Sequence, residues 1–284
     1  MNFSDEDHQL IDFALREDIG AGDVTSAYFV DEDDQASARI IAKERAVVAG
    51  VAVAAEVFRH FDPVLRVEIV QPDGAIVGGG ATVMEIRGRA RSILTAERVA
   101  LNFLQRLSGI ATLTHQFVEA AGAHGAKIHD TRKTTPGLRK FEKAAVVAGG
   151  GTNHRFGLYD MVLVKDNHLL ARNGLADMGA AVERVRKERP GLRIEVEADN
   201  LDQVRALLEI PGVEVILLDN MSGSQIREAI AIGKGKVKFE ASGGINIRNV
   251  RQIAATGVDF VSIGALTHSA PAIDFSLELT HVDP

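Results

Sequence analysis

Two different patterns of hydrophobic residues divide the chain. Between residues 36 and 89, short apolar runs alternate with polar positions and with turns such as Pro72-Asp73-Gly74, which is typical of an antiparallel sheet. From residue 127 onward, near-continuous apolar runs such as VEVILLD alternate with amphipathic segments, which is typical of parallel strands covered by helices on both faces. The first pattern predicts a sheet in an N-terminal domain, and the second predicts a barrel or a doubly wound sheet.

The second pattern contains six predicted strands. Because a complete barrel of this kind has eight, an incomplete or irregular barrel is the best fit. The strands are predicted at 127–130, 160–165, 192–198, 213–219, 236–241 and 258–263, and helices at 138–148, 174–189, 200–209, 222–232 and 246–256. Helices are also predicted at 5–17, 52–60 and 95–121, the last with a kink or an interruption at Ser108-Gly109.

Composition excludes several classes of protein. The chain of 284 residues has no cysteine, which excludes disulfides, thiolate metal sites and cysteine nucleophiles. Its formal net charge of −7 argues against a surface for nucleic acid or anionic lipid. The N-terminal MNFSDEDHQL lacks the basic and apolar regions of a secretory signal, and no apolar run reaches the roughly 20 residues that span a bilayer. We therefore expect a cytoplasmic protein that binds neither nucleic acid nor membranes.

One segment, residues 130–168, is basic in an otherwise acidic chain. It carries seven Lys or Arg residues against four acids, which predicts an anionic ligand. Two predicted strands end within it, and in a barrel the functional groups belong at the carboxyl ends of the strands. Cations from both strand ends and from the loop between them are therefore expected at one rim. These residues are Arg132, Lys133, His154, Arg155 and Lys165.

The later strand ends supply acids and glycines to the same rim. Glu197 and Asp219 are expected to face each other across adjacent strands, where hard carboxylates beside phosphates suit Mg²⁺. The same acids could instead hold sugar hydroxyls or form ion pairs with Lys133 and Lys165. Gly243-Gly244 follow a strand and precede a predicted helix, so backbone N–H groups there would favour a phosphate. Together these groups imply a phosphorylated sugar and a second, strongly anionic substrate near the arginines.

The basic segment also resembles a known family signature. It reads DTRKTTPGLRKFEKAAVVAGGGTNHRFGLYDMVLVKDNH, which is similar to the signature of the quinolinate phosphoribosyltransferases, or carboxylating nicotinate-nucleotide pyrophosphorylases. Further matches follow in family order over nearly the whole chain: EDIGAGDVTS near the start, TAERVALNFLQRLSGIAT at 95–112, EVEADN at 195–200, LLDN at 217–220, EASGGI at 240–245 and VSIGALTHSAPAIDFSL at 261–277. One departure is the spacing between Glu197 and Asp219, which is one residue longer than the family pattern.

The resemblance implies a fold and a reaction. The fold is α/β: an N-terminal α/β sandwich domain, residues 1–112 joined by the C-terminal segment 266–284, and an incomplete six-stranded α/β barrel, residues 113–265. The reaction joins quinolinate to 5-phosphoribosyl 1-diphosphate and releases diphosphate and CO₂, with Mg²⁺ as cofactor. Its product is nicotinate mononucleotide, an intermediate of de novo NAD biosynthesis. Family members are homodimers in which the N-terminal domain of one subunit closes the barrel mouth of the other; assembly beyond the dimer, to a hexamer, is left open.

Individual roles follow from the same resemblance. The implied catalytic residues are Lys133, which would balance the charge of the leaving diphosphate, and Glu197 and Asp219, which would stabilise positive charge on the ribose. The two acids would also hold Mg²⁺, directly or through water. Arg98 would reach the quinolinate site of the partner subunit. The full substrate-binding set is Arg98, Thr131, Arg132, Lys133, His154, Arg155, Lys165, Glu197, Asp219, Ser242, Gly243, Gly244, Ile263, Gly264 and Ala265.

Three other functions fit parts of the pattern. The molybdenum-transport-associated relative shares the fold and part of the signature, but the intact NHR at 153–155 and KDNH at 165–168 argue against it. An aldolase-type barrel would use Lys165 as a Schiff-base lysine. A non-catalytic anion-binding protein on the same fold would use the basic pocket without turnover.

Overall fold

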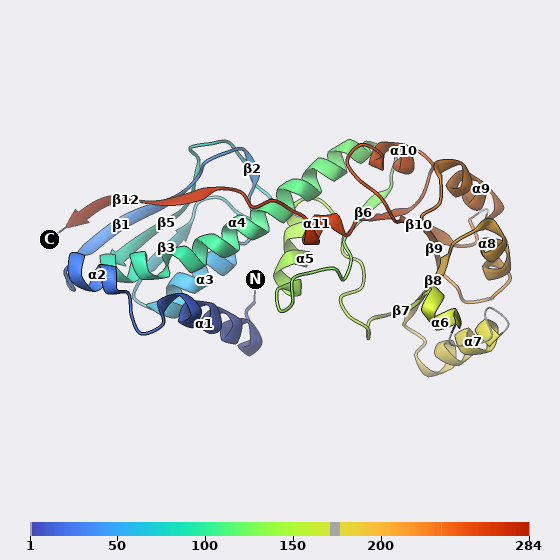
Figure 1. Ribbon diagram of the computed structural model, residues 1–284, viewed down its shortest axis with the longest axis horizontal. Helices are drawn as coiled ribbons and strands as arrows, with labels where there is room; N and C mark the ends of the chain where they lie inside the picture. Colours follow the sequence, from blue (N-terminus) through green and yellow to red (C-terminus); the bar gives the residue numbers. More distant parts are fainter. Residues whose placement is uncertain (1, 171–176, 234, 284) are drawn as a thin grey trace. The chain divides into compact units, whose positions relative to one another are not determined.

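The computed structural model describes residues 2–170, 177–233 and 235–283. The chain divides into two compact units (Figure 1). The first contains residues 1–115, 135–150 and 270–284, and the second contains residues 116–134 and 151–269. No helix among the described residues is both long and apolar enough to cross a membrane.

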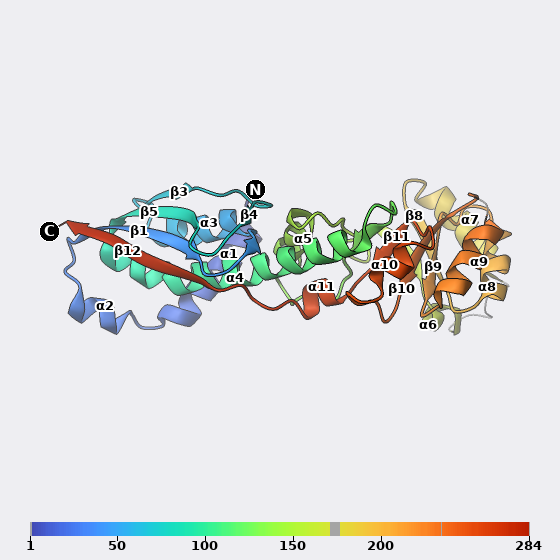
Figure 2. The same ribbon diagram turned by 90° about the horizontal axis from the view of Figure 1, so that it is seen from above.

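The first unit is built on an antiparallel sheet of four strands in the order β12-β1-β5-β3. Alternating burial along β1 puts one face of the sheet into the core, as the period-2 pattern predicts. The C-terminal strand pairs with β1 along its whole length, so the end of the chain returns to the first unit (Figure 2). The strands are β1 (Gln35–Ala42), β3 (Arg66–Ile69), β5 (Thr82–Arg89) and β12 (Phe275–Asp283), with a separate pair β2 (Ala46–Val47) and β4 (Ile76–Val77).

Five helices belong to this unit. They are α1 (Asp5–Ile19), α2 (Val24–Phe29), α3 (Val51–Phe61), α5 (Arg139–Ala148) and most of α4 (Ala90–Ala121). The first of them begins at a capping box, in which Ser4 and Asp7 satisfy each other's backbone N–H groups. The short α2 was not predicted; it begins where Asp23 accepts a hydrogen bond from the backbone of Ser26.

The predicted interruption at Ser108-Gly109 is wrong, because α4 is one continuous helix from Ala90 to Ala121. Its glycine serves close packing instead. A Cβ atom added at Gly109 would lie 2.0 Å from the carbonyl oxygen of Pro271, in the segment that leads into β12. Ser108 is fully buried and bonds to the backbone of Ala49 through its hydroxyl group, so it also ties the helix to its neighbours.

We expect Gly109→Ala to lower the thermal melting midpoint. The added methyl group gains about 1 kcal/mol of helix propensity, but overpacking against an immobile backbone carbonyl costs about 1–3 kcal/mol. Gly179→Ala is the matched control, since it also adds a methyl group to a helix but meets nothing within 4 Å. The control should melt at or above the wild-type temperature. A Gly109→Ala protein that is as stable as the control would contradict the packing argument.

The second unit contains six parallel strands in the order β6-β11-β10-β9-β8-β7. The end strands β6 and β7 do not pair with each other among the described residues, and β6 instead forms an isolated parallel bridge from His129 to Thr152. The sheet is therefore an incomplete barrel, as the sequence predicts. The central strand β9 is buried from Val215 to Leu218, which explains its near-continuous apolar sequence. The strands are β6 (Lys127–His129), β7 (Met161–Val164), β8 (Arg193–Ala198), β9 (Val215–Asp219), β10 (Lys238–Ser242) and β11 (Phe260–Ser262).

Helices in the connections cover the outer face of this sheet, where α7, α8 and α9 are drawn outside the strands (Figure 1). The helices are α6 (Asp166–Leu170), α7 (Met178–Glu188), α8 (Leu201–Leu208), α9 (Gly223–Gly233), α10 (Val250–Ala254) and α11 (Ala265–His268). Because every connection returns to the same end, the carboxyl ends of the strands meet at one rim. The first three residues of the helix predicted at 174–189 lie outside the described residues.

Two differences from the predicted organisation concern the rim. The helix predicted at 246–256 is confined to α10, because Asn246 and Asn249 use their side-chain amides to bond the carbonyl oxygen of Gly244 in a turn. Residues 135–150 were assigned to the barrel from sequence, whereas in the structure they belong to the first unit. Glu142 in that segment is fully buried and pairs with Arg106 on α4 at 2.9 Å.

Candidate active site

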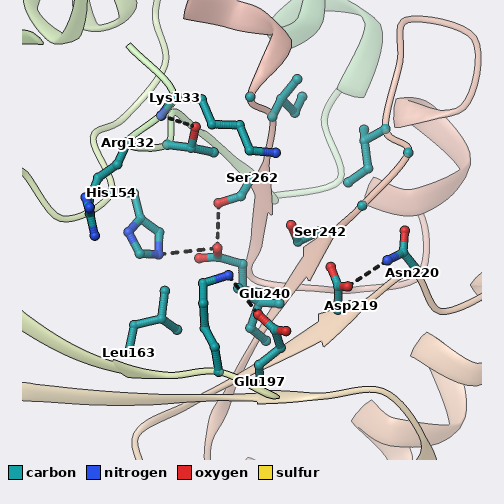
Figure 3. A pocket seen from close by; sticks show the side chains of 18 of the residues that line it. Arg132, Lys133, His154, Leu163, Glu197, Asp219, Asn220, Glu240, Ser242 and Ser262 are labelled. Carbon is teal, nitrogen blue, oxygen red and sulfur yellow. Dashed lines mark hydrogen bonds and ion pairs between the residues drawn. The ribbon is translucent and has the colours of Figure 1, made fainter. Parts of the chain in front are cut away.

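A cavity of about 700 Å³ opens at the carboxyl ends of the barrel strands, within the second unit (Figure 3). It brings together every site residue predicted from sequence except Arg98. That arginine lies on α4 in the first unit, with its side chain 56% exposed. The predicted residues that line the cavity are Thr131, Arg132, Lys133, His154, Arg155, Lys165, Glu197, Asp219, Ser242, Gly243, Gly244, Ile263, Gly264 and Ala265.

The basic half of the cavity contains two arginines that repel each other. The pKa of Arg155 is below its ordinary value. The main cause is burial, and the second is the positive charge of Arg132. One guanidinium N–H of Arg155 donates to the backbone carbonyl of Met161 at 3.3 Å, which orients the side chain. Two neighbouring guanidinium groups suit a ligand with more than one carboxylate, because such a ligand relieves their repulsion.

The acidic half of the cavity lies on the adjacent strands β8 and β9. Glu197 accepts a hydrogen bond from the ammonium group of Lys165 at 3.0 Å, so one of the ion pairs considered from sequence is confirmed. Asp219 accepts a hydrogen bond from the side-chain amide of Asn220 at 2.6 Å (Figure 3). An ammonium group held in this ion pair is protonated and hence not nucleophilic, which disfavours Lys165 as a Schiff-base lysine.

This acidic half also has the donor set for a hard cation. Carboxylate oxygens of Glu197, Asp199 and Asp219 lie within 4.8 Å of one another. Mg²⁺ takes oxygen ligands and typically uses one or two protein carboxylates, with waters and substrate phosphates as the rest. The residues present therefore fit Mg²⁺, with Asp199 as an acid that the sequence analysis did not assign.

The glycines at the next strand end allow a close approach of the backbone. Gly243 and Gly244 have φ angles of 90° and 61°, in the region that favours glycine. A Cβ atom at Gly243 would lie 2.1 Å from the side-chain oxygen of Asn220, so no side chain fits there. At the following strand end, a Cβ atom at Gly264 would lie 2.9 Å from the side chain of Lys133. The loop geometry therefore keeps this part of the cavity open for a bulky anion.

A buried group of titratable residues adjoins the basic half. Nε2 of His154 lies 3.1 Å from Glu195 Oε2 and 3.4 Å from Glu240 Oε1. Glu240 also contacts His129, with 3.2 Å between Oε2 and Nδ1, and accepts a hydrogen bond from the Ser262 hydroxyl (Figure 3). Burial alone lowers the pKa of His154, but its hydrogen bonds with the two carboxylates outweigh burial and raise the pKa to about 9. His154 is thereby favoured as a cation.

Sequence reasoning did not assign several of these residues. Glu240 interrupts an apolar strand and shares its face with Ser242, and a charged residue at such a position was the available signal. Asn220 is the one residue other than glycine with a positive φ among those described, at 54°, but that angle is not visible in a sequence. His268 lines the cavity from α11, a single turn of helix that the hydrophobic pattern did not predict.

Comparisons with known proteins agree with this fold and site. Family models described as the N-terminal and C-terminal domains of quinolinate phosphoribosyl transferase match residues 23–108 and 110–278. A chloroplastic nicotinate-nucleotide pyrophosphorylase [carboxylating] of rice, Oryza sativa subsp. japonica, is 43% identical over 95% of this chain and 76% of its own length. A probable enzyme of that name from Bacillus subtilis (strain 168) is 40% identical over 96% of this chain and 93% of its own.

A solved structure agrees as well. The crystal structure of NadC from Streptococcus pyogenes is 41% identical, covers 100% of both chains and superimposes with a TM-score of 0.93. The fold and the site define an α/β-barrel phosphoribosyltransferase. The chain belongs to the quinolinate phosphoribosyltransferase family, as its two domain matches and full-length relatives show. The predicted family, fold class and enzyme class are confirmed, and the two alternatives on the same fold, the molybdenum-transport-associated relative and an anion-binding protein, are not favoured.

Proposed function

We propose that the cavity of the second unit is the active site, where quinolinate and 5-phosphoribosyl 1-diphosphate give nicotinate mononucleotide, diphosphate and CO₂. The supporting observation is that one cavity combines a pair of arginines, a pair of carboxylates on adjacent strands and two glycine turns. These three groups match a dicarboxylate, a ribose and a phosphate respectively. The reaction then needs no covalent nucleophile, because the cavity mainly positions and neutralises charge.

Quinolinate is assigned to the basic half. Arg132 and Arg155 would bind its two carboxylates, and Lys165 and the His154 ring would add positive charge. Decarboxylation would then proceed from the ribosylated pyridinium ring: the bond from the ring carbon next to nitrogen to the carboxylate breaks, and CO₂ departs. The positively charged nitrogen would stabilise the electron pair left on that carbon, and a proton from water would take the place of CO₂. The protein contributes by holding the ring in one orientation while positive charge surrounds the carboxylates.

The phosphoribosyl substrate is assigned to the rest of the cavity. The 5-phosphate would bind the backbone at Gly243, Gly244 and Gly264, and Lys133 would balance the charge of the departing diphosphate. As the bond to diphosphate breaks, positive charge develops on the ribose, and Glu197 and Asp219 stabilise it electrostatically. Mg²⁺ held by these acids, directly or through water, would neutralise diphosphate charge.

A homodimer with shared sites is part of this proposal. Within the first unit, a cavity of about 470 Å³ is lined by apolar side chains such as Val99, Phe103 and Phe13, and Phe13 is 61% exposed. Exposed apolar surface of this kind is typical of protein–protein contacts. Asn102 also lines this cavity and lies four residues after Arg98 on α4, on the same face of the helix, so a partner subunit seated here would meet the exposed guanidinium group of Arg98. Whether dimers assemble further, to a hexamer, stays open.

The cellular location also stays a prediction. We propose a cytoplasmic protein, and one relative comes from the bacterium Bacillus subtilis. The rice relative, by contrast, is named as chloroplastic and extends beyond the matched region. Location therefore varies among the relatives of this chain.

The central test is release of CO₂ from carboxyl-labelled quinolinate. We expect release by the purified protein only when 5-phosphoribosyl 1-diphosphate is present, with nicotinate mononucleotide formed in equal amount. Removing Mg²⁺ with EDTA should stop release, and adding Mg²⁺ should restore it, because the acidic half needs a cation to receive a highly charged diphosphate. A folded protein that releases no CO₂ with both substrates and Mg²⁺ present would contradict the proposed function.

A further inference from the structure

The buried carboxylate of Glu240 connects four parts of the barrel. It is 1% exposed on β10 and contacts His129 at the end of β6 and Ser262 at the end of β11. On its other side, Oε1 lies 3.4 Å from His154, in the loop before β7. Glu195 on β8 is equally buried and contacts the same His154 nitrogen. None of the roles proposed for substrate binding uses Glu240.

We propose that Glu240 is a positioning residue for the basic half of the site: its buried carboxylate keeps the His154 ring protonated and oriented, so that the ring adds one positive charge for a dicarboxylate ligand. The inference rests on the proposed quinolinate site, and it assigns to Glu240, a buried residue at the wall of the cavity, an action on quinolinate through His154. The effect of the Glu240 charge on the pKa of His154 does not depend on the substrate and can be measured without any ligand.

Hydrogen bonding indicates which carboxylate carries the negative charge. Both oxygens of Glu240 face donors, from Ser262 and His129 as well as from His154. At Glu195, by contrast, Oε1 is buried and has no partner among the described residues. Burial alone would raise the pKa of Glu240, but hydrogen bonds from His129 and His154 outweigh it and lower the pKa to about 2. Glu240 is therefore the ionised carboxylate of the pair.

The two sides of the His154 ring favour different protonation states. The backbone N–H of Arg155 points at Nδ1 over 2.8 Å, and Nδ1 can accept only when it carries no proton, in the neutral ring. On the Nε2 side, the carboxylates favour the charged ring. A hydrogen bond between charged groups is roughly twice as strong as one between neutral groups. The carboxylate side therefore prevails as long as Glu240 is ionised, and loss of that charge leaves the Arg155 contact to favour the neutral ring.

Glu195 contacts the same Nε2 atom of His154 at 3.1 Å and also favours the charged ring, so Glu240 supplies part of this effect. Arg132 and Arg155 are positive and disfavour a third cation beside them. Charged and titratable groups face His154, or a cavity of about 30 Å³ next to it, from several elements: His129 on β6, Glu195 and Arg193 on β8, Glu240 on β10, and Arg132 and Arg155 in the flanking loops. The buried Asp130, directly after β6, accepts a hydrogen bond from the backbone N–H of His154 at 2.9 Å.

The direction of the pH dependence follows. A ring with a pKa of about 9 is charged below pH 9 and loses its charge above it, so quinolinate binding should be retained across neutral pH. Without the Glu240 charge, we expect the pKa to return toward the ordinary value of 6.5. A complete return to 6.5 would leave the ring about 3% protonated at pH 8 and lower quinolinate affinity roughly 30-fold if binding needs the cation. Because Glu195 still contacts Nε2, we expect a smaller loss.

The variant that tests this is Glu240→Gln, which keeps the size of the side chain and removes its charge. We expect KM for quinolinate to rise at pH 8 by roughly threefold or more, up to about 30-fold, and by less than about twofold at pH 6, with kcat affected far less than KM. Ser262→Ala is the matched control, because it removes one hydrogen bond to Glu240 but leaves the carboxylate ionised. Its pH profile should keep the wild-type midpoint.

Titration of the histidine ring by NMR gives an independent measurement on the ligand-free protein. With ¹³C-labelled histidine, and His154→Asn to assign the resonance, we expect a midpoint near pH 9 in the wild type. In Glu240→Gln the midpoint should lie roughly one pH unit or more lower. A wild-type ring that titrates at its ordinary pH, or a Glu240→Gln defect of equal size at all pH values, would overturn the inference. If the titrations differ as expected but quinolinate does not bind, the proposed function fails instead.

Discussion

Glu197→Gln and Asp219→Asn should each lower kcat by about 100- to 1000-fold, the loss typical of removing one electrostatic contact to a transition state. Both carboxylates lie at the carboxyl ends of adjacent strands and line the cavity beside the glycine turns. They face the place where we expect positive charge to develop on the ribose as diphosphate leaves. Since an amide retains the shape but not the charge, the rate should fall more than substrate binding does.

The two variants also separate two roles of the acidic half. Glu197 is paired with Lys165, whereas Asp219 is hydrogen-bonded to Asn220, so only Glu197→Gln releases an ammonium group. We therefore expect Glu197→Gln to change KM for quinolinate as well, and Asp219→Asn to change it little. Both should need more Mg²⁺ for half-maximal rate.

Steady-state rates as a function of each substrate and of Mg²⁺ provide the measurement. Asp202→Asn is the matched control, because Asp202 is a carboxylate with its side chain 94% exposed on α8 and paired only with nearby Arg205 at 3.0 Å. That control should behave like the wild type. If Glu197→Gln and Asp219→Asn both keep kcat within about threefold of the wild-type value, these acids do not stabilise the transition state as proposed.

The strand-and-helix order could be read from sequence because local periodicity dictates it. Buried parallel strands have apolar residues at consecutive positions, and the strand Val215–Asp219 shows this directly. The short helices escaped prediction because one or two turns carry too few residues for a 3.6-residue period to appear. The sequence did not show why glycine stands at position 109, because both a break in a helix and close packing, here against Pro271, favour glycine.

The rim residues were predictable for a related reason. In a parallel barrel each strand end lies at the same rim, so order along the chain suffices to gather Lys165, Glu197 and Asp219 into one cavity. Glu240 was not predictable in this way. Its role depends on His129 and His154, which are 111 and 86 positions away, and nothing local to Glu240 specifies those contacts. A buried charge within an apolar strand indicates that partners exist, but the fold must identify them.

Mixing two inactive variants should restore activity if the site is shared between subunits. Arg98→Ala removes a cation that lies outside the cavity of its own barrel unit, and Lys133→Ala removes one inside it. We expect each variant alone to lose at least about 100-fold in kcat/KM, as is typical when one charged contact to a highly charged substrate is lost.

In a mixed dimer, one of the two sites carries both substitutions and the other carries neither. With equal amounts and free exchange, half of the dimers are mixed and half of their sites are intact, so activity should recover to about a quarter of the wild-type value. Native mass spectrometry with one variant isotopically labelled shows whether subunits have exchanged. Mixing Arg98→Ala with additional Arg98→Ala protein is the control and should restore nothing. Mixed dimers that form but stay inactive would show that Arg98 does not act in the site of its partner.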